Sequence, residues 1–184
     1  TYAASRHFTQ PQPPKPGEIP PHERFYYLEL LRRAGWIDAL PSDAPVRLHA
    51  KPRSWDGTGL EGRVIGVSPG AAFGSAKRWL PQRFAETAVR LAREIPGGPA
   101  SVAVFGSKDE RDVAEIVTAA IAAQNVTAVN FAGATSLREF IERAAACRLF
   151  LTNDNGAMHV VSALGVPTVA IFGATNHITT GPAG

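Results

Sequence analysis

The 184-residue sequence predicts an α/β fold, a parallel β-sheet with helices on both of its faces. Two observations lead to this expectation. From residue 64 onward, short apolar runs alternate with helical patterns of about ten residues, which is typical of βαβ units. Turns rich in glycine and small polar residues follow several of the apolar runs, as at the ligand-binding edge of such sheets. Because βαβ crossovers are right-handed, we expect a Rossmann-like sheet of five parallel strands.

Two segments precede the alternation. Six of the fifteen prolines fall between Pro11 and Pro21, a composition that excludes a helix or a central strand and predicts a linker or a surface extension. Residues 23–33 then carry apolar side chains at helical spacing and end before Gly35. This pattern predicts an amphipathic helix that needs a partner surface.

The alternation itself gives each element in order. The expected strands cover residues 64–67, 102–105, 128–131, 149–152 and 168–172. The expected helices cover residues 84–93, 113–123, 137–146 and 156–164. Ser136 and Glu139 have the spacing of a capping box that opens the third of these helices, and Gly165 can end the fourth.

Composition narrows the class of protein. No apolar run approaches the roughly 18 residues of a bilayer-spanning helix, so we expect a soluble globular protein. The formal net charge is +3 and the isoelectric point about 9.3, but the cations are dispersed, which argues against nucleic-acid binding. The single cysteine, Cys147, has no disulfide partner and fits a small core residue. No Asp-x-Asp motif occurs, so no metal site of that kind is indicated.

The polar turn at residues 152–159 holds the strongest candidate site residues. It follows an expected strand and contains Asn153, Asp154, Asn155, Gly156 and His159. These residues could simply cap the next helix, and a lone histidine on a helix is more often structural. One side chain is enough to cap a helix, however, and this turn has three amide or acid side chains in succession. The N-terminus of a helix also favours the binding of phosphate. We therefore favour ligand contact here.

Two further turns are candidates. Residues 68–79 form a loop in which small residues precede Lys77, and this lysine could neutralise a phosphate. An ordinary glycine-rich turn with exposed cations explains the same pattern equally well. The loop lacks the P-loop pattern. After the second strand, Asp109 and Glu110 begin a helix. One of them suits the helix dipole, and the other could accept hydrogen bonds from a sugar.

Five motifs together resemble the ADP-heptose:lipopolysaccharide heptosyltransferases of glycosyltransferase family 9, most closely the heptosyltransferase II type. They lie at residues 68–81, 105–109, 131–137, 152–159 and 163–175. The resemblance implies a GT-B glycosyltransferase with two Rossmann-like domains, of which this chain is the C-terminal half. Residues 1–60 would be the end of the acceptor domain with a Pro-rich connector and amphipathic helix. Residues 61–184 would be the donor-binding domain, truncated at its C-terminus.

The resemblance also assigns substrate-binding roles. The turn at Gly70, Ala71 and Ala72 would lie beside the pyrophosphate, and Lys77 would meet the phosphate or the ribose. Asp109 or Glu110 would hold the ribose, and Thr135 and Leu137 would border the adenine. Asp154 would touch the heptose, the backbone N–H groups of Asn155 and Gly156 would hold phosphate, and His159 would support that site. The family usually has Ser or Thr in place of Asn155, whose amide could donate instead.

The implied reaction is inverting transfer of heptose from ADP-heptose to the lipopolysaccharide inner core on lipid A, without a cofactor or a metal. The general base would belong to the absent N-terminal domain, so no catalytic residue is expected here, and the chain alone should bind donor without turnover. The location would be cytoplasmic, with peripheral contact to the inner membrane. Two alternatives stay open: a GT-B transferase for another nucleotide sugar, and a non-catalytic nucleotide-binding module.

Overall fold

The computed structural model describes residues 14, 15, 17–71 and 75–184, and the chain divides into two compact units. One unit contains the described residues up to Pro45 together with Asn176–Gly181, and the other contains Val46–Thr175 and Pro182–Gly184. The chain therefore enters the second unit at Val46, before the boundary expected near residue 60. The backbone N–H groups of Val46 and Leu48 donate to Ala183 and Ala163 of the same unit, both at 2.8 Å.

The first unit contains the expected amphipathic helix, α1 (Glu23–Arg33), and the short helix α6 (His177–Thr180). His22 caps α1 because its Nδ1 accepts the N–H of Arg24, so Nε2 carries the proton and donates to the carbonyl of Gly181 at 2.8 Å. Glu29 is buried, and its hydrogen bonds with Arg32 and then Arg33 lower its pKa to about 2. In the part of the chain that the structure describes, no helix has the length and apolar character needed to cross a bilayer.

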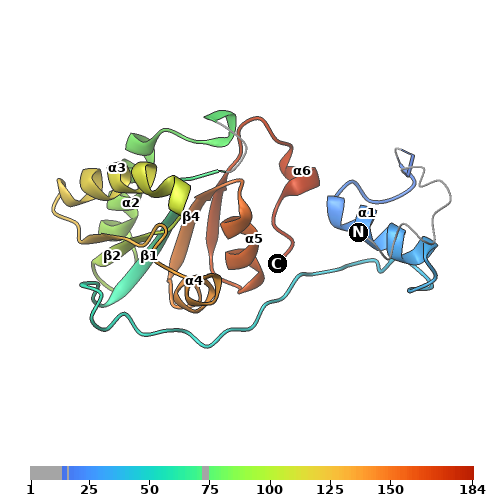
Figure 1. Ribbon diagram of the computed structural model, residues 1–184, viewed down its shortest axis with the longest axis horizontal. Helices are drawn as coiled ribbons and strands as arrows, with labels where there is room; N and C mark the ends of the chain where they lie inside the picture. The colour runs from blue at the N-terminus through green and yellow to red at the C-terminus, as the bar shows by residue number, and fades with distance from the viewer. Residues whose placement is uncertain (1–13, 16, 72–74) are drawn as a thin grey trace. The chain divides into compact units, whose positions relative to one another are not determined.

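The second unit is built on the predicted five-stranded parallel sheet (Figure 1). Its strands are β1 (Arg63–Ser68), β2 (Ala100–Val104), β3 (Ala128–Asn130), β4 (Leu149–Asn153) and β5 (Thr168–Ile171). The order across the sheet is β3-β2-β1-β4-β5, with every pairing parallel. The winding reverses between β1 and β4, and in open α/β sheets ligands bind at the carboxyl ends of strands at this position.

Helices cover both faces of this sheet, which confirms the predicted fold class. They are α2 (Pro81–Glu94), α3 (Arg111–Ala122), α4 (Leu137–Ala144) and α5 (Gly156–Ala163), with 3₁₀ turns η2 (Ser75–Lys77) and η3 (Lys108–Glu110). Successive residues of β1 face opposite sides of the sheet. Ile65 packs with α2 and α3, and Val64 packs with α4 and α5. Figure 1 shows α2 and α3 together on one side of the strands.

Candidate functional site

A cavity of about 600 Å³ opens at the carboxyl ends of β1 to β4, where the loops after these four strands converge. The topology explains its place, because parallel strands bring the loops that follow them to one edge of the sheet. Its lining consists of Ser68, Ala71, Arg78, Phe105, Gly106, Ser107, Asp109, Glu110, Thr135, Ser136, Leu137, Phe140, Asn155, Gly156 and Ala157.

Most site residues expected from the sequence line this cavity. They are Ala71, Asp109, Glu110, Thr135, Leu137, Asn155 and Gly156. Four others lie outside the lining: Gly70, Lys77, Asp154 and His159. Ala72 lies outside the described residues. The expected residues from four separate turns thus meet at one place.

The turn after β1 is held by side chains that bind its carbonyl groups. Asn153 Nδ2 donates to the carbonyl of Pro69 at 2.7 Å, and Asn155 Nδ2 donates to that of Gly70 at 2.8 Å. The Arg78 guanidinium donates to the carbonyl of Ala71 at 3.0 and 3.2 Å. An N–H points opposite to the C=O of its own trans peptide. Within the described residues, the N–H groups of Gly70 and Ala71 donate to no acceptor, and Ala71 lines the cavity.

The N-terminus of α5 offers a second set of donors. Asn155 caps this helix, as its Oδ1 accepts the N–H of Met158 at 3.2 Å. Among residues that the structure describes, no acceptor receives the backbone N–H of Asn155, Gly156 or Ala157. Free N–H groups and the helix dipole together suit a phosphate. Capping and ligand binding therefore use different atoms of Asn155: its side chain caps, and its backbone stays available.

Lys77 and Asp154 form a pair beside the cavity. Lys77 Nζ lies 2.9 Å from Asp154 Oδ2, and Thr175 Oγ1 donates to the same oxygen at 2.6 Å. Asp154 is 6% exposed. Burial raises the pKa of this carboxyl, but the hydrogen bonds from Thr175 and Lys77, with the charges of Lys77 and His159, outweigh it and bring the pKa below its ordinary value. Asp154 is therefore a carboxylate that holds Lys77 between the turn after β1 and the N-terminus of α5.

The structure separates the roles of Asp109 and Glu110. Glu110 Oε2 accepts the N–H and the hydroxyl of Ser107 at 2.8 and 3.0 Å, so this residue caps its own helical turn. Glu110 also packs over Gly70, where an added Cβ would lie 2.1 Å from Glu110 Oε1. Asp109 is exposed in the cavity lining and has no hydrogen bond to another described residue. Asp109 is the acid that can accept hydrogen bonds from a ligand.

The far wall of the cavity is apolar. Leu137 begins α4 and is 70% exposed, while Phe140 of the same helix meets Phe105 edge to face at 5.3 Å between ring centroids. An aromatic or heterocyclic ring can pack against such side chains.

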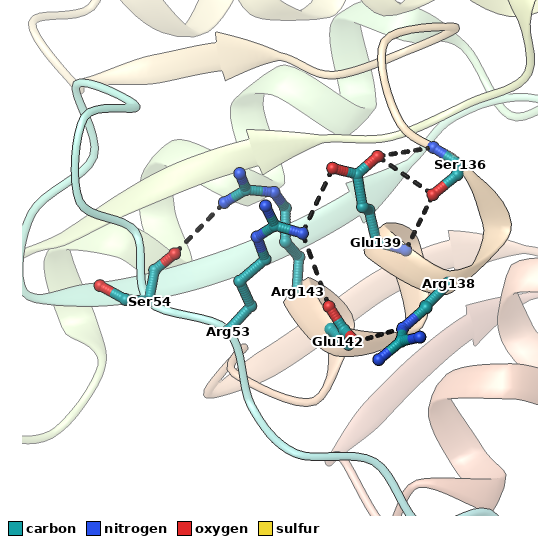
Figure 2. A network of polar contacts seen from close by, with 7 residues as sticks. All are labelled: Arg53, Ser54, Ser136, Arg138, Glu139, Glu142 and Arg143. Atoms are coloured by element: carbon teal, nitrogen blue, oxygen red, sulfur yellow. Dashed lines mark hydrogen bonds and ion pairs between the residues drawn. The ribbon is translucent and has the colours of Figure 1, made fainter.

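Polar contacts hold α4 in place (Figure 2). The predicted capping box is formed, because Ser136 Oγ accepts the N–H of Glu139 and Glu139 Oε2 accepts the N–H of Ser136. Arg53 lies 3.2 Å from Glu139 and 3.5 Å from Glu142, and so ties the segment before β1 to this helix. The apolar wall thus rests on a helix that is capped at its N-terminus and ion-paired with the segment before β1.

Some lining residues were not singled out from the sequence. Ser68 and Arg78 lie in the motif at residues 68–81, but in the sequence Ser68 resembles a strand end and Arg78 an exposed surface cation. Phe105 lies in an expected strand and Phe140 in an expected helix, and apolar periodicity alone does not separate a core ring from a cavity wall. Among the described residues no three His, Cys, Asp or Glu side chains gather as a metal site would require.

Comparisons with known proteins identify the family of this chain. The model of the family described as glycosyltransferase family 9 (heptosyltransferase) matches residues 27–184. The lipopolysaccharide heptosyltransferase 2 of Salmonella typhimurium is 41% identical over 120 residues, which is 65% of this chain and 33% of that protein. The lipooligosaccharide heptosyltransferase 2 of Campylobacter jejuni (strain 81116) is 34% identical over 121 residues, or 65% of this chain and 37% of its own length.

Solved structures show the same likeness. The structure of E. coli ADP-heptose lps heptosyltransferase II matches with a TM-score of 0.59 and 37% identity, covering 66% of this chain and 36% of the other. A family 9 glycosyl transferase from Veillonella parvula matches with a TM-score of 0.70 over 93% of this chain and 48% of the other, and at 24% identity it supports the fold alone. This chain spans about a third of the length of the heptosyltransferases in sequence comparison. The chain belongs to glycosyltransferase family 9, the heptosyltransferase family.

Proposed function

We propose that this chain is the donor-binding part of an inverting heptosyltransferase, which transfers heptose from ADP-heptose to the lipopolysaccharide inner core. The observation that carries the proposal is the cavity with two groups of unoccupied backbone N–H donors at one end and an apolar wall at the other. A nucleoside diphosphate has a matching division between charged phosphates and a flat base. Relatives named lipopolysaccharide or lipooligosaccharide heptosyltransferase 2 support heptose as the transferred sugar and lipopolysaccharide as the acceptor.

The proposed binding mode follows the lining residues. The adenine packs against Leu137 and Phe140, beside Thr135, and a ribose hydroxyl donates to Asp109. The pyrophosphate lies between the turn at Gly70 and Ala71 and the N-terminus of α5. Lys77 reaches the phosphate from its position on Asp154, and Asp154 lies toward the heptose, with His159 behind it.

The proposed chemistry is a single displacement at the anomeric carbon. An acceptor hydroxyl forms the new C–O bond on one face while the bond to the β-phosphate oxygen breaks on the other. The electron pair leaves with ADP, and the proton of the hydroxyl passes to a base in the part of the enzyme that carries the acceptor. N–H groups already aimed at the phosphate stabilise the charge that develops on ADP.

Calorimetric titration of the chain with ADP, GDP and UDP tests the proposal. We expect ADP to bind more tightly than the other two, and Lys77→Ala to weaken ADP binding about ten-fold through loss of a charged contact. Arg83→Ala is the matched control, because Arg83 is an exposed cation on α2 that pairs with Glu86. Equal binding of all three nucleotides would contradict the choice of donor. A folded chain that binds none of them would refute the donor site.

A further inference from the structure

We propose that Ser68 donates a hydrogen bond to a phosphate oxygen of the bound nucleotide, and that Asn155 sets the direction of this hydroxyl. The inference deepens the proposed function and rests on it. Ser68 is the last residue of β1, it is 3% exposed, and it lines the cavity. A buried hydroxyl at the wall of a cavity needs a partner for its hydrogen.

The amide of Asn155 is oriented without ambiguity. Its oxygen accepts the N–H of Met158 at 3.2 Å and also lies 3.1 Å from the hydroxyl of Thr152, which shares its hydrogen with the carbonyl of Asn153 at 2.9 Å. Its nitrogen lies 2.8 Å from the carbonyl of Gly70 and 3.1 Å from Ser68 Oγ. A backbone N–H can only donate and a carbonyl can only accept, so exchanging the amide oxygen and nitrogen would break both backbone contacts.

This orientation determines the state of the Ser68 hydroxyl. Because Asn155 Nδ2 must donate, Ser68 Oγ accepts, and the hydroxyl hydrogen points elsewhere. Within the described residues no acceptor takes that hydrogen. Both N–H groups of the Asn155 amide are engaged as well, so this amide does not replace a ligand-binding hydroxyl itself. It positions one on the neighbouring strand.

The surroundings of Ser68 indicate the chemistry of the acceptor. Gly156 and Ala157, at the N-terminus of α5, line the same cavity and present unoccupied N–H groups. An oxygen that receives a hydroxyl and helix N-terminal N–H groups together is best an anionic one, such as a phosphate oxygen. The lining therefore combines a side-chain donor from β1 with backbone donors from α5.

The test compares adenosine with and without its phosphates, and with phosphate alone. ADP, AMP, adenosine and inorganic phosphate are titrated by calorimetry into the chain, into Ser68→Ala and into Ser101→Ala. Ser101 is the matched control, because it is a buried strand serine, 8% exposed, whose hydroxyl donates to the carbonyl of Glu61. We expect Ser68→Ala to weaken ADP binding about ten-fold and to leave adenosine binding unchanged.

The outcomes separate the two proposals. A Ser68→Ala chain that binds ADP as tightly as the parent overturns the role of Ser68 and leaves the donor site intact. A parent chain that binds no ADP overturns the donor site and this inference with it. If inorganic phosphate binding falls as ADP binding does, the hydroxyl recognises phosphate from either source. If Ser68→Ala does not fold, Ser68→Cys replaces it, since its thiol fills the site with a poor donor, and the same loss of ADP affinity is expected.

Discussion

Asp154 gives the site a pH dependence that can be measured as stability. Its folded-state pKa lies below the ordinary value of 3.8, so the folded state favours the carboxylate. The resulting stability is fully present above the unfolded pKa and is lost as the pH falls through the lower folded value. At pH 6 we expect Asp154→Asn to be less stable than the parent by about 1–3 kcal/mol.

Urea denaturation of both chains at pH 6 and pH 3 measures this difference. The gap between parent and Asp154→Asn should narrow as the pH falls. Asp109→Asn serves as the control, because Asp109 is an exposed carboxyl without a described partner. A gap that is equal at both pH values would show that the carboxylate charge is not what stabilises this position.

The neighbouring acids should respond differently to removal. Asp109→Ala is expected to weaken ADP binding several-fold, because the proposed binding mode places the ribose at its carboxylate. The melting temperature should stay unchanged, because this exposed carboxylate has no hydrogen bond to another described residue. Glu110→Ala should lower stability by about 1 kcal/mol, because it removes the cap on Ser107. Calorimetry and thermal melts of both variants check this. Reversed effects would exchange the proposed roles of the two residues.

At the level of the elements, Gly66 of β1 lets the ring of Phe150 on β4 pack directly against the backbone of β1. An added Cβ at Gly66 would lie 2.2 Å from the ring of Phe150 and 3.1 Å from Cys147 Sγ. We expect Gly66→Ala to destabilise the protein by about 1–3 kcal/mol, the range of overpacked cores. Gly156→Ala is the control, because its added methyl group meets no atom within 4 Å. Chemical denaturation measures the stability of both variants. Equal stability of Gly66→Ala and Gly156→Ala would contradict the prediction.

The elements were also the part of the molecule most open to prediction. Each predicted strand lies within two residues of an observed one, because apolar runs, caps and glycine stops are local signals. Contacts across the chain were not predictable in the same way. Asn153 binds the carbonyl of Pro69, 84 positions away, and no pattern near either residue encodes that pairing. Likewise, the passage into the second unit at Val46 depends on backbone bonds to residues more than a hundred positions later.

For the whole molecule, we expect donor binding without transfer. In the proposed binding mode Asp109 meets the ribose, and Glu110 caps its own turn. Asp154, on the heptose side, is bound by Lys77 and Thr175, so we assign none of these three acids as the general base. The purified chain, mixed with ADP-heptose and an inner-core acceptor, should release no ADP above the rate of spontaneous hydrolysis. A coupled assay for ADP measures this. Transfer by this chain alone would mean that a general base lies within it.

The packing at Gly66 also supplies a reporter. Cys147, the one cysteine of the sequence, is 7% exposed, and burial raises the pKa of its thiol above the ordinary range. Thiol-reactive reagents attack the thiolate, so labelling must wait until the layer between the sheet and α4 opens. The rate of alkylation therefore measures how often this layer opens. No cysteine has to be introduced for the experiment. If ADP slows the alkylation of Cys147, ligand binding at one edge of the sheet reduces local opening of the layer beneath α4.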